Sequence, residues 1–165
     1  MILACLTILV VAGPVTASNL LGHRAGWDST VKVNKVALSA QFNTQVNNVL
    51  SESVNPTDIT LQIAIDQAAA NWEVNIYDAN YGDTGWAGHW NCQVWGSMTV
   101  CTQGRVRLNQ VVSYTNQEAK SLACEEIGHS LGLAHSNEVN ASCMSQQWNQ
   151  TKLSTHDRNH LNSIY

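Results

Sequence analysis

The chain has 165 residues and a formal net charge of −4, and only 12% of its residues are charged. This length suits one domain with a hydrophobic core of its own. Because the sequence contains no run of basic residues, nothing in it indicates nucleic acid or an anionic membrane surface as a partner.

The first 17 residues have the composition of a secretory signal peptide. They form a short apolar run that is closed by small residues and ends at Ala17. We therefore predict cleavage after Ala17. The run is also too short to cross a bilayer comfortably. No Lys or Arg precedes the run, so a retained N-terminal anchor is the alternative. After cleavage, residues 18–165 would be a secreted, extracellular domain with no stable membrane association.

In the first half of this domain, the composition predicts a strand over residues 31–38. Residues 41–55 are polar and rich in Asn and Ser, and we expect a loop there with a helical turn at most. Residues 59–72 are predicted to form a helix, because a set of apolar residues falls on one helical face: Leu61, Ile65, Ala68 and Trp72. Residues 59–63 also alternate as a strand would, but the alanines at 68–70 favour the helix.

In the second half, residues 74–77 and 105–109 are predicted strands. Residues 81–100 are dense in Gly and Trp and are expected to form loops and edge strands. A capping box, Thr115-x-x-Glu118, predicts the start of a helix. Residues 154–157 are expected to begin a short C-terminal helix.

Signal removal would take away Cys5 and leave four cysteines: Cys92, Cys101, Cys124 and Cys143. An even number of cysteines in an exported chain indicates two disulfides. Of the three possible connectivities we favour Cys92–Cys101 with Cys124–Cys143, because both close short loops. The alternative of zinc-binding or free thiols is disfavoured by the absence of C-x-x-C spacing.

The stretch that carries the chemistry has the pattern E-E-x-x-H-x-x-G-x-x-H over residues 125–135. Glu125 and His129 lie four residues apart, so on a helix they share one face. Glu126 then projects beside a bound metal without having to ligate it. Gly132 can end the helix, because glycine accepts a left-handed conformation, and the chain can turn back to deliver His135. Gly128, in mid-helix, is expected to permit close packing.

This stretch closely resembles H-E-x-x-H-x-x-G-x-x-H, the zinc site of the metzincin peptidases, with Glu125 in place of the first histidine. Ser136 after the last histidine is the choice of the matrixin branch, and Met144 stands where the methionine of the Met-turn is expected. The resemblance implies an α+β fold: a small twisted mixed sheet, two long helices including the active-site helix, a Met-turn and a short C-terminal helix. Residues 59–72 would be its first helix.

The resemblance further implies a zinc-dependent endopeptidase, expected to be a monomer, that hydrolyses peptide bonds in protein or peptide substrates through a metal-activated water. His129 and His135 would be zinc ligands and Glu126 the general base. Met144 would form an apolar floor beneath the metal. Substrate would lie extended along an edge strand near residues 86–90, with a pocket walled by Trp148.

A glutamate at position 125, in place of the first histidine, is compatible with two different functions. Two histidines and one glutamate form a known catalytic zinc set, so Glu125 can complete the site, although an anionic ligand makes the bound water less acidic. If Glu125 instead turns away, metal binding weakens and the chain becomes a non-catalytic secreted protein that binds peptides. The general base Glu126 is retained beside the altered ligand, and this favours the enzyme.

Overall fold

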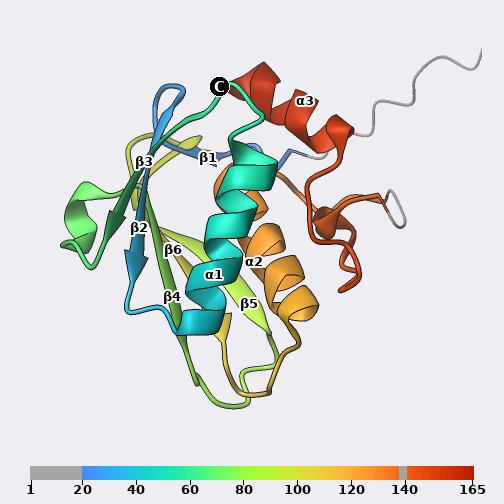
Figure 1. The fold of residues 1–165 in the computed structure, drawn as a ribbon. Helices are drawn as coiled ribbons and strands as arrows, with labels where there is room; N and C mark the ends of the chain where they lie inside the picture. Colours follow the sequence, from blue (N-terminus) through green and yellow to red (C-terminus); the bar gives the residue numbers. More distant parts are fainter. Residues whose placement is uncertain (1–19, 138–140) are drawn as a thin grey trace, which may run out of the picture.

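The computed structural model describes residues 20–137 and 141–165, so the predicted signal peptide lies outside the described residues (Figure 1). Within these residues, six strands form one sheet. The strands are β1 (Arg24–Ala25), β2 (Thr30–Val36), β3 (Thr60–Ile65), β4 (Val74–Ala79), β5 (Gly88–Trp95) and β6 (Val100–Asn109). The α-helices are α1 (Ala40–Val49), α2 (Asn116–Ser130) and α3 (Thr155–Ile164).

The sheet is mixed, as the sequence led us to expect. Its strands follow the order β3-β2-β4-β6, all parallel, and β5 pairs with β6 in the antiparallel direction. The two-residue strand β1 pairs with the start of β6. Among the described strands β5 pairs only with β6, so its other edge is left without a backbone partner.

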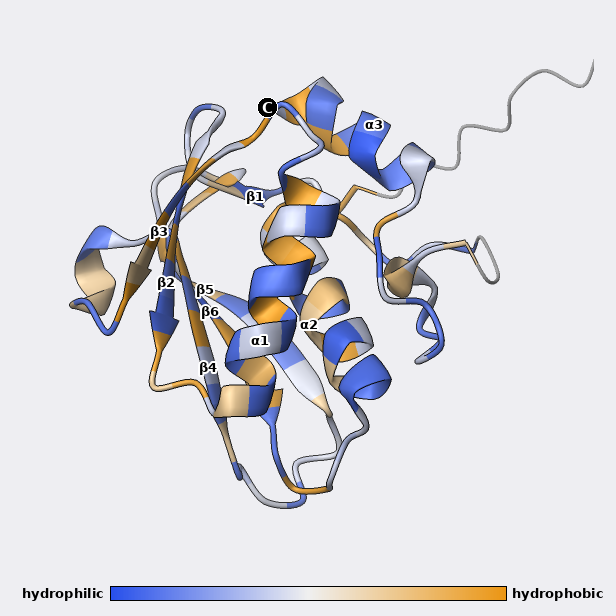
Figure 2. Ribbon diagram, in the orientation of Figure 1, coloured by the Kyte–Doolittle hydropathy of each residue, from blue (hydrophilic) through white to orange (hydrophobic). Residues whose placement is uncertain are grey.

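Helices α1 and α2 lie against one face of the sheet and contact each other, whereas α3 lies at one end of the molecule (Figure 1). Bands of apolar residues on α1 alternate with hydrophilic ones (Figure 2). The core between these layers contains Val33 and Ile76 from the sheet, Val46 from α1 and Ile127 from α2. This α+β arrangement confirms the predicted fold class.

The prediction for residues 41–55 was wrong. Helix α1 begins after the N-cap Ser39 and continues through a π-helical turn, Leu50–Val54. Phe42, Val46 and Val49 stand at helical spacing and are buried, together with Gln45. The polar residues between them concealed this apolar face in the sequence.

The predicted helix over residues 59–72, and its assignment as the first helix of the fold, were also wrong. The segment forms β3 and a short 3₁₀ turn, Ala69–Asn71. Thr60–Ile65 pairs residue by residue with β2, and Ile65 on this edge strand is 59% exposed. Of the apolar residues that suggested a buried helical face, Leu61 and Ile65 therefore belong to a strand that is covered only in part, and Ala68 and Trp72 flank the 3₁₀ turn.

The remaining elements agree with the predictions in type. The strands at 31–38, 74–77 and 105–109 lie within or overlap β2, β4 and β6, and β5 is an edge strand within the segment 81–100. Capping boxes are present at the start of α2 and of α3. No helix in the described parts of the chain has the length and apolar character needed to span a membrane.

Both predicted disulfides are formed. Cys92 and Cys101 link β5 to β6, with their Cα atoms 5.7 Å apart. Cys124 and Cys143 link α2 to the 3₁₀ turn Cys143–Ser145, with a Cα–Cα distance of 5.9 Å.

Candidate metal centre

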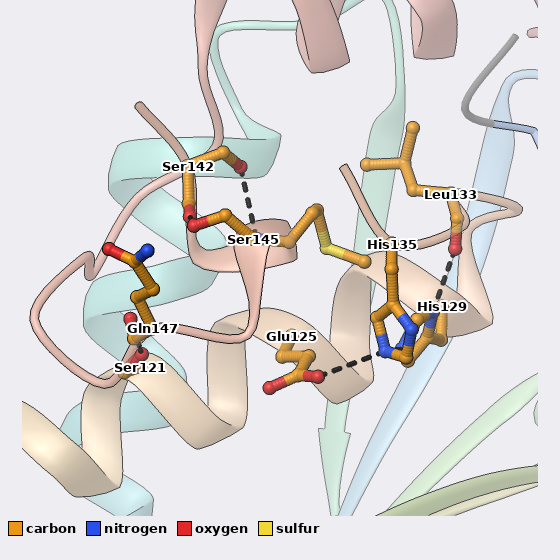
Figure 3. A network of polar contacts seen from close by, with 9 residues as sticks. Ser121, Glu125, His129, Leu133, His135, Ser142, Ser145 and Gln147 are labelled. Carbon is orange, nitrogen blue, oxygen red and sulfur yellow. Dashed lines mark hydrogen bonds and ion pairs between the residues drawn. The ribbon is translucent and has the colours of Figure 1, made fainter. Parts of the chain in front are cut away.

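Three side chains converge at the C-terminal end of α2. Ligand atoms of Glu125, His129 and His135 all lie within 4.8 Å of one another. The Nε2 atom of His135 is 3.0 Å from Nε2 of His129 and 3.1 Å from Oε1 of Glu125 (Figure 3). Glu125 therefore points toward the two histidines and does not turn away from them.

The backbone turn that brings His135 back to the helix depends on Gly132. This residue follows the C-cap Leu131 and has a φ of +107°, which side-chain-bearing residues rarely adopt. A Cβ atom there would also lie 2.9 Å from the carbonyl oxygen of His23. The predicted role of Gly132 as the helix terminator is confirmed.

A backbone contact fixes the ring of His129. Its Nδ1–H donates to the carbonyl oxygen of Leu133 at 2.8 Å, which leaves Nε2 as the nitrogen with the free lone pair. Burial lowers the pKa of His129 to about 4, and the neighbouring His135 and His23 also lower it. The imidazole is thus held neutral, the form that ligates metals.

The donor set fits a zinc ion. Two ligand atoms at about 2.0–2.1 Å from a tetrahedral zinc are roughly 3.3 Å apart. The separations of 3.0 and 3.1 Å around His135 are close to that value. Two imidazoles and one carboxylate are also a ligand combination found in catalytic zinc sites.

The carboxyl group of Glu126 lies beside this cluster and is almost completely buried, with 6% of the residue exposed. Burial and, to a smaller extent, the charge of Glu125 raise the pKa of Glu126 to about 8, against the opposing effect of a hydrogen bond from the backbone N–H of Trp90. Trp90 therefore ties the carboxylate to β5.

Gly88, at the start of β5, makes room for Glu126. A Cβ atom on Gly88 would lie 2.5 Å from both Cγ and Oε1 of Glu126. Gly88 could not be found from the sequence, because its signal there is only a single glycine before a strand, and the register of that strand against α2 is a tertiary property.

Met144 is fully buried and packs directly against α2. A Cβ atom on Gly128 would lie 2.3 Å from its sulfur, so Gly128 permits the close approach that the sequence predicted. The backbone oxygen of Met144 also accepts a hydrogen bond from the Ser136 N–H at 2.8 Å. This bond joins the turn to the residue that follows His135.

A buried polar network holds the turn from its other side. The Met144 N–H donates to Oγ of Ser142 at 3.1 Å, and this hydroxyl donates to the carboxylate of Asp157 on α3. The same carboxylate oxygen accepts from the N–H and the hydroxyl of Ser154. Asp157 is fully buried, so α3 anchors the turn through a desolvated carboxylate.

The cluster opens into a cleft of about 710 Å³. Trp86 and Trp90 line it from the β5 side, and Trp148 lines it from the segment after Met144. Trp148 is 42% exposed and stacks on Tyr114 with ring centroids 5.5 Å apart. The cleft thus offers aromatic surface beside the free edge of a strand.

The α+β fold, the donor set on α2 and the loop that follows it, and the buried methionine packed against α2 define a metzincin-type metallopeptidase. The sequence matches the profile of the matrixin family over residues 30–165, and the chain belongs to this family. Membership places it among the zinc metallopeptidases and implies protein or peptide substrates.

Among solved structures, the fold is similar to the structure of myroilysin. The match covers 90% of this chain and 93% of that chain, with a TM-score of 0.50 and 12% sequence identity. At this identity the likeness shows the fold alone. No curated protein sequence matches the chain.

Proposed function

We propose that this chain is a secreted zinc-dependent endopeptidase in which Glu125, His129 and His135 hold the metal and Glu126 is the general base. The observation that carries the proposal is the convergence of three donor atoms within 4.8 Å of one another, beside the Glu126 carboxylate, in one cleft. A zinc ion held there supplies positive charge that polarises the scissile carbonyl and acidifies water.

Glu126 handles the proton. Its carboxylate takes a proton from the attacking water as the water oxygen bonds to the carbonyl carbon, and delivers that proton to the leaving amine nitrogen as the C–N bond breaks. The Trp90 N–H orients this carboxylate, and Gly88 leaves space for it. Met144 packs against Gly128 and so supports the turn of the helix that carries the ligands.

The substrate lies in an extended conformation along β5. Its backbone pairs with the strand edge that β6 leaves free, and an apolar side chain packs against Trp148. The two disulfides are compatible with an oxidising, extracellular location, which agrees with the predicted signal peptide.

Metal analysis and a cleavage assay on the same purified protein test this function. We expect stoichiometric zinc and cleavage of an unfolded protein that stops when a chelator is added. Glu126→Gln should keep its zinc and lose about 10²–10⁴-fold in kcat, whereas Glu52→Gln, outside the cleft, serves as the matched control. Equal activity in wild type and Glu126→Gln would refute the proposed base.

The carboxylate at position 125 gives a non-catalytic alternative some support, because it weakens the metal as a Lewis acid. In that case the zinc-loaded wild-type protein would bind unfolded peptides without cleaving them. Binding without cleavage in the same assay would therefore replace the peptidase with a peptide-binding function.

A further inference from the structure

Besides the two histidines of the candidate metal centre, His23 and His89 also face its cleft. His23 lines this cleft together with Glu125, Glu126 and His129. It is not part of the metal cluster: within the described residues, the group of potential ligands consists of Glu125, His129 and His135. His23 is therefore a cleft residue for which metal binding gives no explanation.

The backbone around His23 is fixed on both sides. Residues 20–21 pair with residues 132–133 through a β-bridge and a backbone hydrogen bond of 2.8 Å, against the loop that separates the two histidine ligands. The N–H of Arg24 donates to the carbonyl oxygen of Thr99 at 3.0 Å, close to the hairpin of β5 and β6. His23 is thus held between the ligand loop and the strands that border the cleft.

The ring of His23 is oriented by an aromatic contact. It meets Trp95 at an interplanar angle of 82° with ring centroids 5.3 Å apart. In the part of the chain that the structure describes, neither ring nitrogen of His23 has a hydrogen-bond partner. An imidazole carries at least one N–H in both its neutral and protonated forms, so a donor is always present.

We propose that His23 is a catalytic residue that donates a hydrogen bond to the carbonyl oxygen of the scissile peptide bond. This inference rests on the proposed peptidase function. Negative charge develops on that oxygen as water attacks the carbonyl carbon, so a donor fixed in the cleft stabilises the transition state more than the bound substrate. The proton stays on His23, and the proton transfers remain those of Glu126.

Three variants of the zinc-loaded protein test the assignment. His23→Phe keeps a ring against Trp95 but has no hydrogen-bond donor. His23→Gln has an N–H donor on a side chain without a ring. His156→Phe is the matched control, because His156 lies on α3 and does not line the cleft. The measurements are kcat and KM on a fluorogenic peptide, zinc content and melting temperature.

We expect His23→Phe to lower kcat by about 10²-fold, with KM within about threefold of wild type and zinc content unchanged. His23→Gln should recover about tenfold of this loss, and His156→Phe should match wild type. A kcat for His23→Phe within about twofold of wild type overturns the assignment, as does an effect confined to KM. Loss of zinc in parallel with activity also overturns it, because His23 would then act on the ligand loop.

A binding measurement separates this inference from the proposed function. A phosphinic peptide, whose tetrahedral phosphorus mimics the transition state, should bind His23→Phe about 10²-fold more weakly than wild type, whereas the parent peptide should bind both equally. Wild-type protein that binds the phosphinic peptide but cleaves nothing overturns the peptidase function and with it the catalytic role of His23. Cleavage by wild type together with equal phosphinic affinity of wild type and His23→Phe overturns the role of His23 alone. Wild-type protein that binds neither peptide overturns both.

Discussion

At the scale of single residues, the carboxylate of Glu125 distinguishes this metal centre from one built of three imidazoles. Its oxygen lies 3.1 Å from the His135 nitrogen, so it occupies the position of a ligand. An anionic ligand cancels part of the charge of the ion, which leaves coordinated water less acidic. A zinc ion held by the proposed ligands would therefore be a weaker Lewis acid than one held by three imidazoles.

Replacing Glu125 by histidine tests this effect. We expect Glu125→His to raise kcat by about tenfold, because the ion would keep its full double charge. Glu125→Ala, which removes the ligand, should lower zinc affinity below that of wild type. Zinc titration and steady-state kinetics measure both changes, and a fall in both quantities for Glu125→His would contradict the argument.

The absence of a side chain at Gly88 is a second residue-scale requirement. In Gly88→Ala the new methyl group would meet Glu126, whose Cγ lies 2.5 Å from the Cβ position. We expect about 10²-fold loss of kcat with unchanged zinc content, because the base is displaced and the ligands are not. Gln93→Ala, an exposed position on the same strand, is the control. Wild-type kcat in Gly88→Ala would show that Glu126 can move without cost.

The convergence of the proposed ligands was predictable from the sequence because their spacing is local. One helical turn separates Glu125 from His129, and Gly132 marks the end of that helix. Gly88 and His23 could not be found in the same way. Their roles arise from the packing of β5 and of the N-terminal segment against α2, which connects distant parts of the chain.

At the scale of elements, the predictions for the segments that form α1 and β3 were wrong because sequence patterns do not show which residues the neighbouring elements bury. Apolar residues on β3 remain at the surface, whereas the buried face of α1 includes Gln45 between apolar neighbours. In both segments, burial by neighbouring elements determined the secondary structure, and local periodicity did not. The strands β2, β4 and β6 and helix α2 were predictable because their local patterns agree with their final surroundings.

Two truncations test this assignment of elements. Phe42 is 1% exposed and Ile65 is 59% exposed. Phe42→Ala should therefore lower the free energy of unfolding by about 3–5 kcal/mol, and Ile65→Ala should change it by less than about 1 kcal/mol. Chemical denaturation measures both. Similar losses for the two variants would contradict the packing of α1 and β3.

The contact between α3 and the turn at Met144 depends on Asp157, whose carboxylate accepts hydrogen bonds from Ser142 and Ser154. Asp157→Asn removes the charge from this buried network and should cost about 1.5–3 kcal/mol of stability. Asp58→Asn, at an exposed position, is the control. Thermal or chemical denaturation checks the difference, and equal stability of the two variants would argue against the anchor.

At the scale of the whole molecule, the proposed metal site would couple metal binding to folding. The ligands come from α2 and from the loop beyond it, so the cluster exists only in the folded chain. A ligand that binds only the folded state, present at about 1,000 times its dissociation constant, stabilises it by about 4 kcal/mol. We expect chelation to lower the melting temperature and added zinc to restore it, as calorimetry would show. A melting temperature that does not respond to zinc would contradict a site formed by these residues.

The bond between Cys124 and Cys143 joins the ligand helix to the turn beneath it. Thiols remain reduced in most cytosols and are oxidised after export. If the chain is exported as proposed, a newly made copy would lack this covalent brace until it has left the compartment where it was synthesised. For the proposed secreted peptidase, the redox difference between inside and outside would thus delay the bracing of the site until export and protect the cell that produces it.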